Sequence, residues 1–319
     1  MKKFLILAVA VVLFAAIHVY AGQYPSKPIR IVVPYQAGGS ADLSARIFAK
    51  YAEKEIGGKI AIINMEGASG SVGTRDIAKS DPDGHHFLWN TPSMFTAYQT
   101  GVQSFTWDSM TPIAPVVNFY KVLVVHKDSK WQTLKDLVED AKANPGTIKC
   151  GVSFGAASHF EALGFENGTG AKMRYVAGGG DSQQISAVLG KHIDVYAASD
   201  TIALQYINEG TLRPLGVSSV EELPTLPGVP SYRQQGYDFD FIYNIVLYAP
   251  AKLPDELRER WNQVVKTVLS NKEAVAELEK IGMYANYLDT ENTDKLLLDL
   301  DCKMYRFARI GQLRPDKVN

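Results

Sequence analysis

The length, composition and charge of this chain exclude several classes of protein. Its 319 residues are enough for one or two globular domains, and 46% apolar with 21% charged residues is ordinary for a folded protein. With a formal net charge of −1, the chain lacks the excess of positive charge by which proteins bind nucleic acids and anionic membranes. We therefore expect no nucleic-acid partner.

The first 21 residues have the pattern of a secretory signal peptide. Lys2 and Lys3 form a basic start, residues 4–17 carry no charge, and residues 19–21 supply small side chains at the cleavage positions. The alternative is an uncleaved anchor, but the apolar run is shorter than the ~20 residues of a spanning helix. Cleavage after Ala21 would change the formal charge from −1 to −3. We predict export, most simply to a bacterial periplasm.

Cysteine and histidine usage gives no sign of a disulfide framework or a metal site. Export permits a bond between Cys150 and Cys302, but one distant pair is no framework, and we interpret them as two buried free thiols. His85 and His86 are adjacent and precede an apolar run, without zinc spacing. We expect neither a metal nor another cofactor.

The first part of the mature chain alternates predicted strands and helices. The β-branched run at 29–33 is typical of a strand buried on both faces of a parallel sheet. Leu43, Ile47 and Tyr51 recur every four residues and predict an amphipathic helix. Further along we predict a strand at 60–63, a short helix at 75–79 and a strand at 87–89. This order favours a parallel α/β sheet.

The middle of the chain indicates a second lobe. Two strands follow each other between 113 and 125 with a break at 118–121, which suggests that the chain crosses there. Capping-box patterns at Thr133–Asp136 and Ser158–Glu161 each predict a helix start. Further strands are predicted at 148–152, 174–176, 194–197 and, as the return crossing, 245–249, with helices after 178–182, from 254, at 272–281 and at 293–310. We therefore predict an α/β fold with lobe 1 at 22–122 and 245–319 and lobe 2 at 123–244.

The loops that follow the predicted strands are built from small residues and resemble anion sites. Gly38-Gly39-Ser40 places free backbone N–H groups beside the positive end of a helix dipole. Residues 153–159 and 178–182 repeat this layout, and none of these loops contains Lys or Arg. Each loop alone could be an ordinary strand-to-helix connection. Since ligands of open α/β sheets bind beyond the carboxyl ends of strands, two such lobes predict a cleft.

Several short motifs occur in a fixed order over the mature chain. They are 28–35 with Gly38, Gly39 and Asp42; Asn64 with glycines 67, 70 and 73 and then 82–84; 134–137 with 144–146; Ser158-His159; and 223–224 with 227–230 and 249–250. This ordered set resembles the Bug-type extracytoplasmic solute receptors, the binding proteins of tripartite tricarboxylate transporters.

The resemblance implies a two-lobed periplasmic-binding-protein fold of the Venus-flytrap kind, type II-like, with a mostly parallel sheet flanked by helices in each lobe. It implies that a small carboxylate is gripped by residues of two facing loops. These are Tyr35, Gly38, Gly39, Ser40 and Asp42 on lobe 1, and Ser153, Gly155, Ala156, Ser158 and His159 on lobe 2. The implied partner is a two-component membrane permease, and we expect a monomeric receptor.

Further candidates lie near the other end of the ligand. Thr91 and Ser93 follow the third strand and could contact ligand or water. Gly179 and Asp181 lie where many relatives have a Tyr-Lys-Gly pattern, so a lysine there is missing. If Asp200 faces the cleft, it would repel a second carboxylate; if it is buried away from the ligand, that idea is removed.

Three candidate roles have structural alternatives. For Asp42 we favour a residue that steadies the loop over a ligand contact. His159 could either donate to a carboxylate or orient its loop. Trp89 and Phe154 could line the cleft, although aromatic residues of strands more often lie in the core.

We predict a high-affinity periplasmic receptor that delivers a small organic acid to a permease. The acid could be a di- or tricarboxylate, an aromatic acid or an acidic amino acid. The alternative is a sensing protein that presents its ligand to a sensor kinase. An enzyme is disfavoured because Ser158 and His159 are adjacent, so their side chains diverge, and because no nucleophile elbow or P-loop is present.

Overall fold

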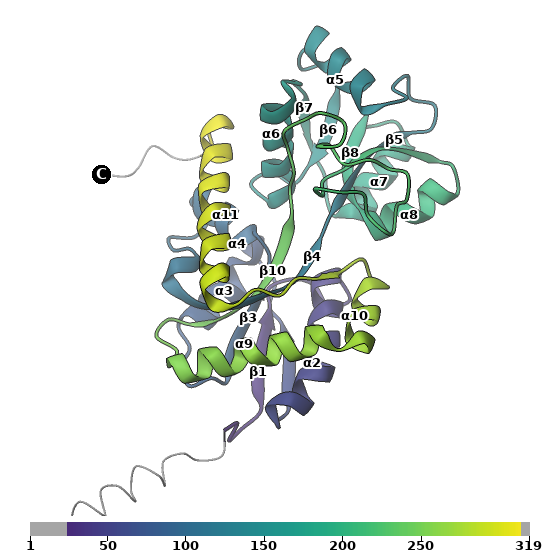
Figure 1. The fold of residues 1–319 in the computed structure, drawn as a ribbon. Coiled ribbons are helices and arrows are strands. Elements are labelled where there is room, and N and C mark those ends of the chain that lie inside the picture. The colour runs from purple at the N-terminus through teal and green to yellow at the C-terminus, as the bar shows by residue number, and fades with distance from the viewer. Residues whose placement is uncertain (1–23, 314–319) are drawn as a thin grey trace, which may run out of the picture.

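The computed structural model describes residues 24–313 as two lobes (Figure 1). The predicted signal peptide at 1–21 lies outside these described residues. Lobe 1 contains the strands β1 (Ile29–Val33), β2 (Ile60–Asn64), β3 (His86–Asn90), β4 (Met110–Phe119), β10 (Tyr243–Pro250) and β11 (Tyr284–Ala285). Its helices are α2 (Ser40–Ile56), α3 (Ser71–Ala78), α4 (Ser93–Gln99), α9 (Asp255–Ser270), α10 (Lys272–Glu279) and α11 (Thr290–Ile310). Lobe 2 contains β5 (Lys121–His126), β6 (Lys149–Val152), β7 (Arg174–Ala177), β8 (Val195–Ser199), β9 (Leu212–Val217), α5 (Leu134–Ala143), α6 (Ala157–Thr169), α7 (Asp181–Leu189) and α8 (Asp200–Asn208).

The two sheets are mixed rather than mostly parallel. Within residues 24–313 the sheet of lobe 1 has the order β11-β4-β10-β3-β1-β2, and that of lobe 2 the order β7-β6-β8-β5-β9. β1 pairs in parallel with β2 and β3, and β6 with β7 and β8, as predicted. The strands next to the crossings pair antiparallel. β10, which returns to lobe 1, pairs with β3 and β4, and β5, which enters lobe 2, pairs with β8 and β9. The two-lobed α/β prediction is confirmed.

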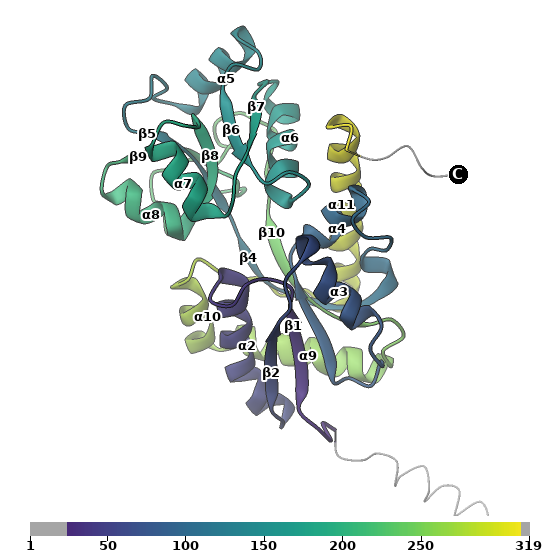
Figure 2. The same ribbon diagram turned by 180° about the vertical axis from the view of Figure 1, so that it is seen from behind.

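The two crossings bring corresponding edges of the sheets together. β4 ends at Phe119 and β5 begins at Lys121, so a single residue separates the two sheets. Lys121 pairs with Ser199 at the end of β8, and Phe119 pairs with Tyr243 at the start of β10. The carboxyl ends of the parallel strands of each lobe therefore lie at the edge where the chain crosses (Figure 2). The predicted lobe boundaries, after residues 122 and 244, lie two residues inside β5 and β10.

Several local features differ from the sequence prediction. α4 is buried on nearly every side, so it shows no amphipathic stripe, and α8 begins directly after β8. β9, also unpredicted, contains Pro214. The capping box of Thr133 and Asp136 is confirmed at the start of α5. Both cysteines are free and Cys150 is buried as predicted, but Cys302 is exposed on α11.

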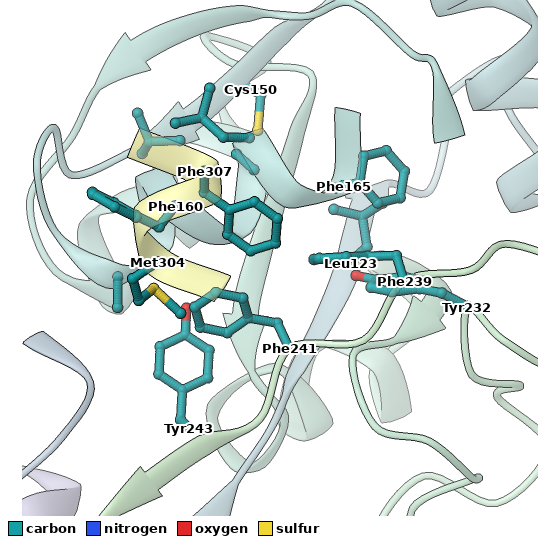
Figure 3. Close-up of a cluster of buried hydrophobic side chains, with 14 of the residues drawn as sticks. Leu123, Cys150, Phe160, Phe165, Tyr232, Phe239, Phe241, Tyr243, Met304 and Phe307 are labelled. Atoms are coloured by element: carbon teal, nitrogen blue, oxygen red, sulfur yellow. The ribbon is translucent and has the colours of Figure 1, made fainter. Parts of the chain in front are cut away.

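Helix α11 reaches from lobe 1 onto lobe 2 and packs into an aromatic cluster. Met304 and Phe307 of α11 face this cluster, which consists of Phe160, Phe165, Tyr232, Phe239, Phe241 and Tyr243 (Figure 3). Gly164 of α6 permits the approach, since a Cβ atom there would lie 2.6 Å from Cζ of Phe307. A packed helix therefore joins the lobes in addition to the crossing strands.

A buried carboxyl group lies beside the return crossing. The hydroxyl of Tyr243 donates to Oε2 of Glu161 at 2.7 Å, whereas Oε1 has no hydrogen-bond partner within residues 24–313. Glu161 is only 2% exposed. This burial raises the pKa of Glu161 to about 7, against the opposing effects of the Tyr243 bond and the charge of Lys121. The carboxyl group therefore takes up a proton close to neutral pH.

Truncation of Phe307 should strongly destabilise the protein. Phe307 is 4% exposed, and Phe307→Ala should lower the free energy of unfolding by about 3–5 kcal/mol through lost burial and a cavity. Leu298 lies on the same helix but is 55% exposed, so Leu298→Ala should change stability by no more than about 0.5 kcal/mol. Urea unfolding measures both values, and equal losses would contradict the packing of α11 on lobe 2.

Glu161 should make stability fall as the pH rises towards neutrality. Its folded-state pKa is raised from 4.5 to about 7, so its contribution is complete below about pH 4.5 and lost by about pH 7. The loss amounts to roughly 3 kcal/mol. Glu161→Gln should flatten this decline in urea unfolding measured between about pH 5 and pH 7, whereas the exposed Glu256→Gln should keep the wild-type slope. A wild-type slope in Glu161→Gln would refute the assignment.

Candidate functional site

Asp42 holds the β1–α2 loop in place. The loop turns at Gly38, whose φ is +79° and whose N–H donates to Oδ2 of Asp42 at 2.8 Å. Arg46 and Asn64 each donate to the same carboxylate at 3.0 Å. Burial opposes the charged form, but the bonds from Arg46, Gly38 and Asn64 outweigh it and lower the pKa of Asp42. The carboxylate is thus engaged by protein groups and steadies the loop.

Tyr35 joins the same loop to the end of β3. Its hydroxyl lies 2.6 Å from Oδ1 of Asn90 and from Oγ1 of Thr91, and it also contacts Oγ of Ser93. Burial raises the pKa of Tyr35, so the phenol stays neutral. The structure therefore brings together three predicted site residues from two loops of lobe 1. Gly39 and Ser40 follow Gly38 directly, at the start of α2.

The β6–α6 loop of lobe 2 is ordered by its own side chains. The N–H of Ser153 donates to Oγ of Ser158 at 3.1 Å, and the N–H of Gly155 donates to Nδ1 of His159 at 3.3 Å. Burial lowers the pKa of His159, so the ring is neutral at pH 7 and its Nδ1 can accept this bond. Of the two roles considered for His159, the structure displays the one that orients the loop.

The predicted capping box at the start of α6 is wrong. The helix begins at Ala157, after an N-cap at Ala156 that supplies no side-chain bond. Ser158 is already inside the first turn and bonds back to the loop, while Glu161 turns inward to Tyr243. The sequence pattern of a hydroxyl followed three residues later by a carboxylate is present, but Ser158 bonds within its own loop and Glu161 bonds to the distant Tyr243.

A buried ion pair lies beneath the β7–α7 loop. Lys121 donates to Asp181 at 2.9 Å, and the hydroxyls of Tyr196 and Ser199 donate to the same carboxylate. Burial alone would raise the pKa of Asp181, but the charge of Lys121 and these hydrogen bonds lower it. Oγ of Ser153 donates to the carbonyl of Gly179 at 3.4 Å and so links the two loops of lobe 2.

Sequence reasoning missed Lys121. It noted that the loop at 178–181 lacks the lysine of many relatives, but a cation reaches this place from the start of β5 instead. Sixty positions separate Lys121 from Asp181 along the chain. The one available signal was the break at 118–121 between two apolar strands, which places Lys121 at a crossing.

Asp200 does not present a free carboxylate to a ligand. It is 1% exposed and accepts bonds from the N–H of Thr201 at 2.8 Å, the hydroxyl of Thr225 at 3.0 Å and the hydroxyl of Tyr284 at 3.1 Å. Tyr284 belongs to β11 of lobe 1, so Asp200 forms a contact between the lobes. Burial raises the pKa of Asp200. The predicted repulsion of a second ligand carboxylate therefore does not follow.

The two aromatic candidates have opposite environments. Trp89 is fully buried and its indole N–H donates to Ser44 at 3.3 Å, so it belongs to the core of lobe 1. Phe154 is 57% exposed at the tip of the β6–α6 loop. The following residue, Gly155, lies close to lobe 1, since a Cβ atom there would be 3.6 Å from Cγ2 of Thr100.

The helices that begin at these loops have no side-chain cap. The N-cap residues of α2, α6 and α7 are Gly39, Ala156 and Gly180, and none supplies a side-chain bond. Of the other helices, α5, α10 and α11 are capped by Thr133, Asn271 and Asp289, whereas α3, α4, α8 and α9 have no side-chain cap. Uncapped first-turn N–H groups together with the helix dipole are suited to bind an anion.

Residues 24–313 contain no candidate metal site and no candidate membrane span. In this range no group of three or more His, Cys, Asp or Glu side chains is placed to hold a metal ion. No helix in the same range has the length and apolar character needed to cross a membrane.

Solved structures of periplasmic binding proteins share this fold. The periplasmic binding protein BugD is 25% identical, with a TM-score of 0.72 and coverage of 91% of this chain and 98% of its own. An R. palustris protein with adipate is 21% identical, with a TM-score of 0.76 and coverage of 91% and 98%. MatC from Rhodopseudomonas palustris with bound malate is also 21% identical, with a TM-score of 0.74 and coverage of 90% and 99%.

Curated relatives extend over most of the chain. A UPF0065 protein of Agrobacterium vitis is 29% identical over 95% of this chain and 90% of its own length. Protein BugT of Bordetella pertussis is 27% identical over 81% of each chain. The sequence model described as the tripartite tricarboxylate transporter family receptor matches residues 44–310. This chain therefore belongs to the receptor family of the tripartite tricarboxylate transporters, the family of solute-binding receptors that its motifs resemble.

Proposed function

We propose that this protein is a periplasmic receptor that binds a small organic acid between its lobes and delivers it to a two-component membrane permease. The observation that supports this most strongly is the set of uncapped helix starts at the facing sheet edges. α2 contributes one from lobe 1, and α6 and α7 contribute two from lobe 2. Together they offer an anion backbone N–H groups from both sides.

Family membership and the solved relatives support the same ligand chemistry. Members of this family are solute-binding receptors rather than enzymes. Two relatives of the same fold are described with adipate and with malate, both of which are carboxylates. Cleavage of the N-terminal signal after Ala21 would deliver the mature chain to the periplasm.

We propose a ligand contact set drawn from both lobes. The ligand carboxylate would contact backbone N–H groups and hydroxyls. Asp42 and His159 would position their loops, and Asp181 and Asp200 would stay bonded to Lys121 and Tyr284 instead of contacting the ligand. The proposed contacts are Tyr35, Gly38, Gly39, Ser40, Thr91 and Ser93 on lobe 1, and Ser153, Gly155, Ala156, Ser158 and Gly179 on lobe 2.

These groups are sufficient for a scavenging receptor. A hydrogen bond to a charged group contributes about 1.5–3 kcal/mol, and a helix terminus about 0.3–1 kcal/mol, rising to ~2 kcal/mol when partly buried. About four or five such bonds, less the cost of association, correspond to micromolar affinity or better.

A thermal-shift screen should identify a carboxylate ligand. The mature protein is heated with mono-, di- and tricarboxylates, aromatic acids and acidic amino acids, and with the amides of the same acids as controls. A ligand at about 100 times its dissociation constant should add about 2.7 kcal/mol of stability, which shifts the melting temperature visibly. Shifts that are as large with the amides would contradict a carboxylate site.

Substitutions in the two loops should weaken binding without unfolding the protein. Ser40→Arg fills the start of α2 and opposes its dipole, and Ser158→Ala removes the acceptor of the Ser153 N–H. Both should lower the affinity for the best ligand of the screen, measured by calorimetry. Thr133→Ala, at the capping box of α5, is the control and should cost about 0.5–2 kcal/mol of stability but no affinity. Unchanged affinity in both loop variants would exclude this site.

A further inference from the structure

The charges around the proposed site cancel in pairs. Lys121 is bound to Asp181 at 2.9 Å, and Arg46 to Asp42 at 3.0 Å. His159, the third group that could carry positive charge, is buried, and burial lowers its pKa so that the ring is neutral at pH 7. The loops themselves contain neither Lys nor Arg, at 34–42, 153–159 and 178–182. These ion pairs and loops therefore contain no unpaired cation that could neutralise a second negative charge on the ligand.

The uncapped starts of α2, α6 and α7 are also unequal. α2 and α7 each carry an aspartate in the first turn, whereas α6 has no acidic residue there. A carboxylate in the first turn already interacts with the positive end of its helix dipole. One glycine N–H is already bonded in each of the loops before α2 and α6, that of Gly38 to Asp42 and that of Gly155 to His159, so these two loops differ in the first-turn aspartate. The start of α6, after the loop at 153–156, is therefore the most favourable place for the carboxylate of a ligand.

An exposed aromatic ring lies in that same loop. Phe154 is 57% exposed and packs edge-on against His159, with ring centroids 5.0 Å apart, and His159 packs in the same way on Tyr175 at 5.1 Å. The contact with His159 therefore holds one side of the Phe154 ring, while much of the ring faces solvent. Val72, in the first turn of α3 on lobe 1, is 42% exposed. Exposed apolar side chains beside polar groups are typical of ligand sites.

We propose that the preferred ligand carries a single carboxylate on an apolar body and that a second carboxylate is selected against. This inference rests on the proposed function, because it concerns the ligand of the same site. A second carboxylate would lose its hydration without meeting an unpaired cation, which is unfavourable. The apolar body would instead cover the open part of the Phe154 ring. The dicarboxylates of the two relatives are therefore not the preferred ligands expected here.

Matched pairs of acids test this inference directly. The mature protein, freed of co-purified ligand by unfolding and refolding, is titrated in a calorimeter with hexanoate, adipate, benzoate and terephthalate. Each monocarboxylate that binds should do so at least about tenfold more tightly than its dicarboxylate partner. Equal or tighter binding of either dicarboxylate, or no binding of either monocarboxylate, overturns the inference.

Neutral analogues separate failure of this inference from failure of the proposed function. If hexanamide and benzamide bind as tightly as the two acids, the site does not recognise a carboxylate and the proposed function itself fails. If the amides do not bind but adipate or terephthalate is preferred, the receptor function stands and only the single-carboxylate inference is lost.

Two variants test the apolar contact and the charge balance. Phe154→Ala should weaken benzoate binding at least about tenfold, whereas Leu298→Ala, an exposed apolar residue on α11, should leave it unchanged. Asp181→Asn removes the partner of Lys121 and should reduce the preference for hexanoate over adipate. Unchanged benzoate affinity in Phe154→Ala contradicts the apolar contact. An unchanged preference in Asp181→Asn, shown by its melting curve to be folded, contradicts the charge argument; if it does not fold, the acid pairs decide.

Discussion

The short link between β4 and β5 determines where everything else in the site can lie. Only Tyr120 separates Phe119, in the sheet of lobe 1, from Lys121, in the sheet of lobe 2. A link of one residue cannot reach around a sheet, so the edges that carry the carboxyl ends of the parallel strands must face each other. The loops after β1, β3, β6 and β7 gather there because of this connection, and Lys121 arrives at the same edge.

Within and beside these loops, several charged and polar side chains hold the backbone in place. Asp42 and His159 each accept an N–H from a turning glycine, and Asp181 and Asp200 are enclosed by hydroxyls and a lysine. Each of these side chains is a candidate ligand contact in the sequence, although for Asp42 we favour a role in steadying the loop. In the structure they fix the loop geometry, which supports the proposal that backbone N–H groups bind the ligand. Such preorganised loops lose little conformational entropy when a ligand binds.

The parts of this fold that sequence could predict are those with a local signal. The strand at 29–33, the turn at Gly38-Gly39 and the capping box at Thr133 are determined by neighbouring residues, and each is found in the structure. The pairing of Lys121 with Asp181 and of Asp200 with Tyr284 depends on how distant segments meet. The start of α6 failed for the same reason, since Glu161 bonds to Tyr243 from another part of the chain. Periodicity and turn chemistry carry no information about such partners.

The contacts of α11 and β11 limit how the lobes can turn relative to each other. Helix α11 lies on one side of the crossing strands β4 and β10, and α10 lies on the other (Figure 1). Phe307 of α11 is packed into lobe 2, and Tyr284 of β11, the strand in contact with α10, is bonded to Asp200. A rigid rotation that preserves both contacts must take place about the line that joins them, and this line passes close to β4 and β10. Twisting about the long axis of the molecule would break one contact or the other. A relative rotation of the lobes that keeps both contacts is therefore restricted to this one axis.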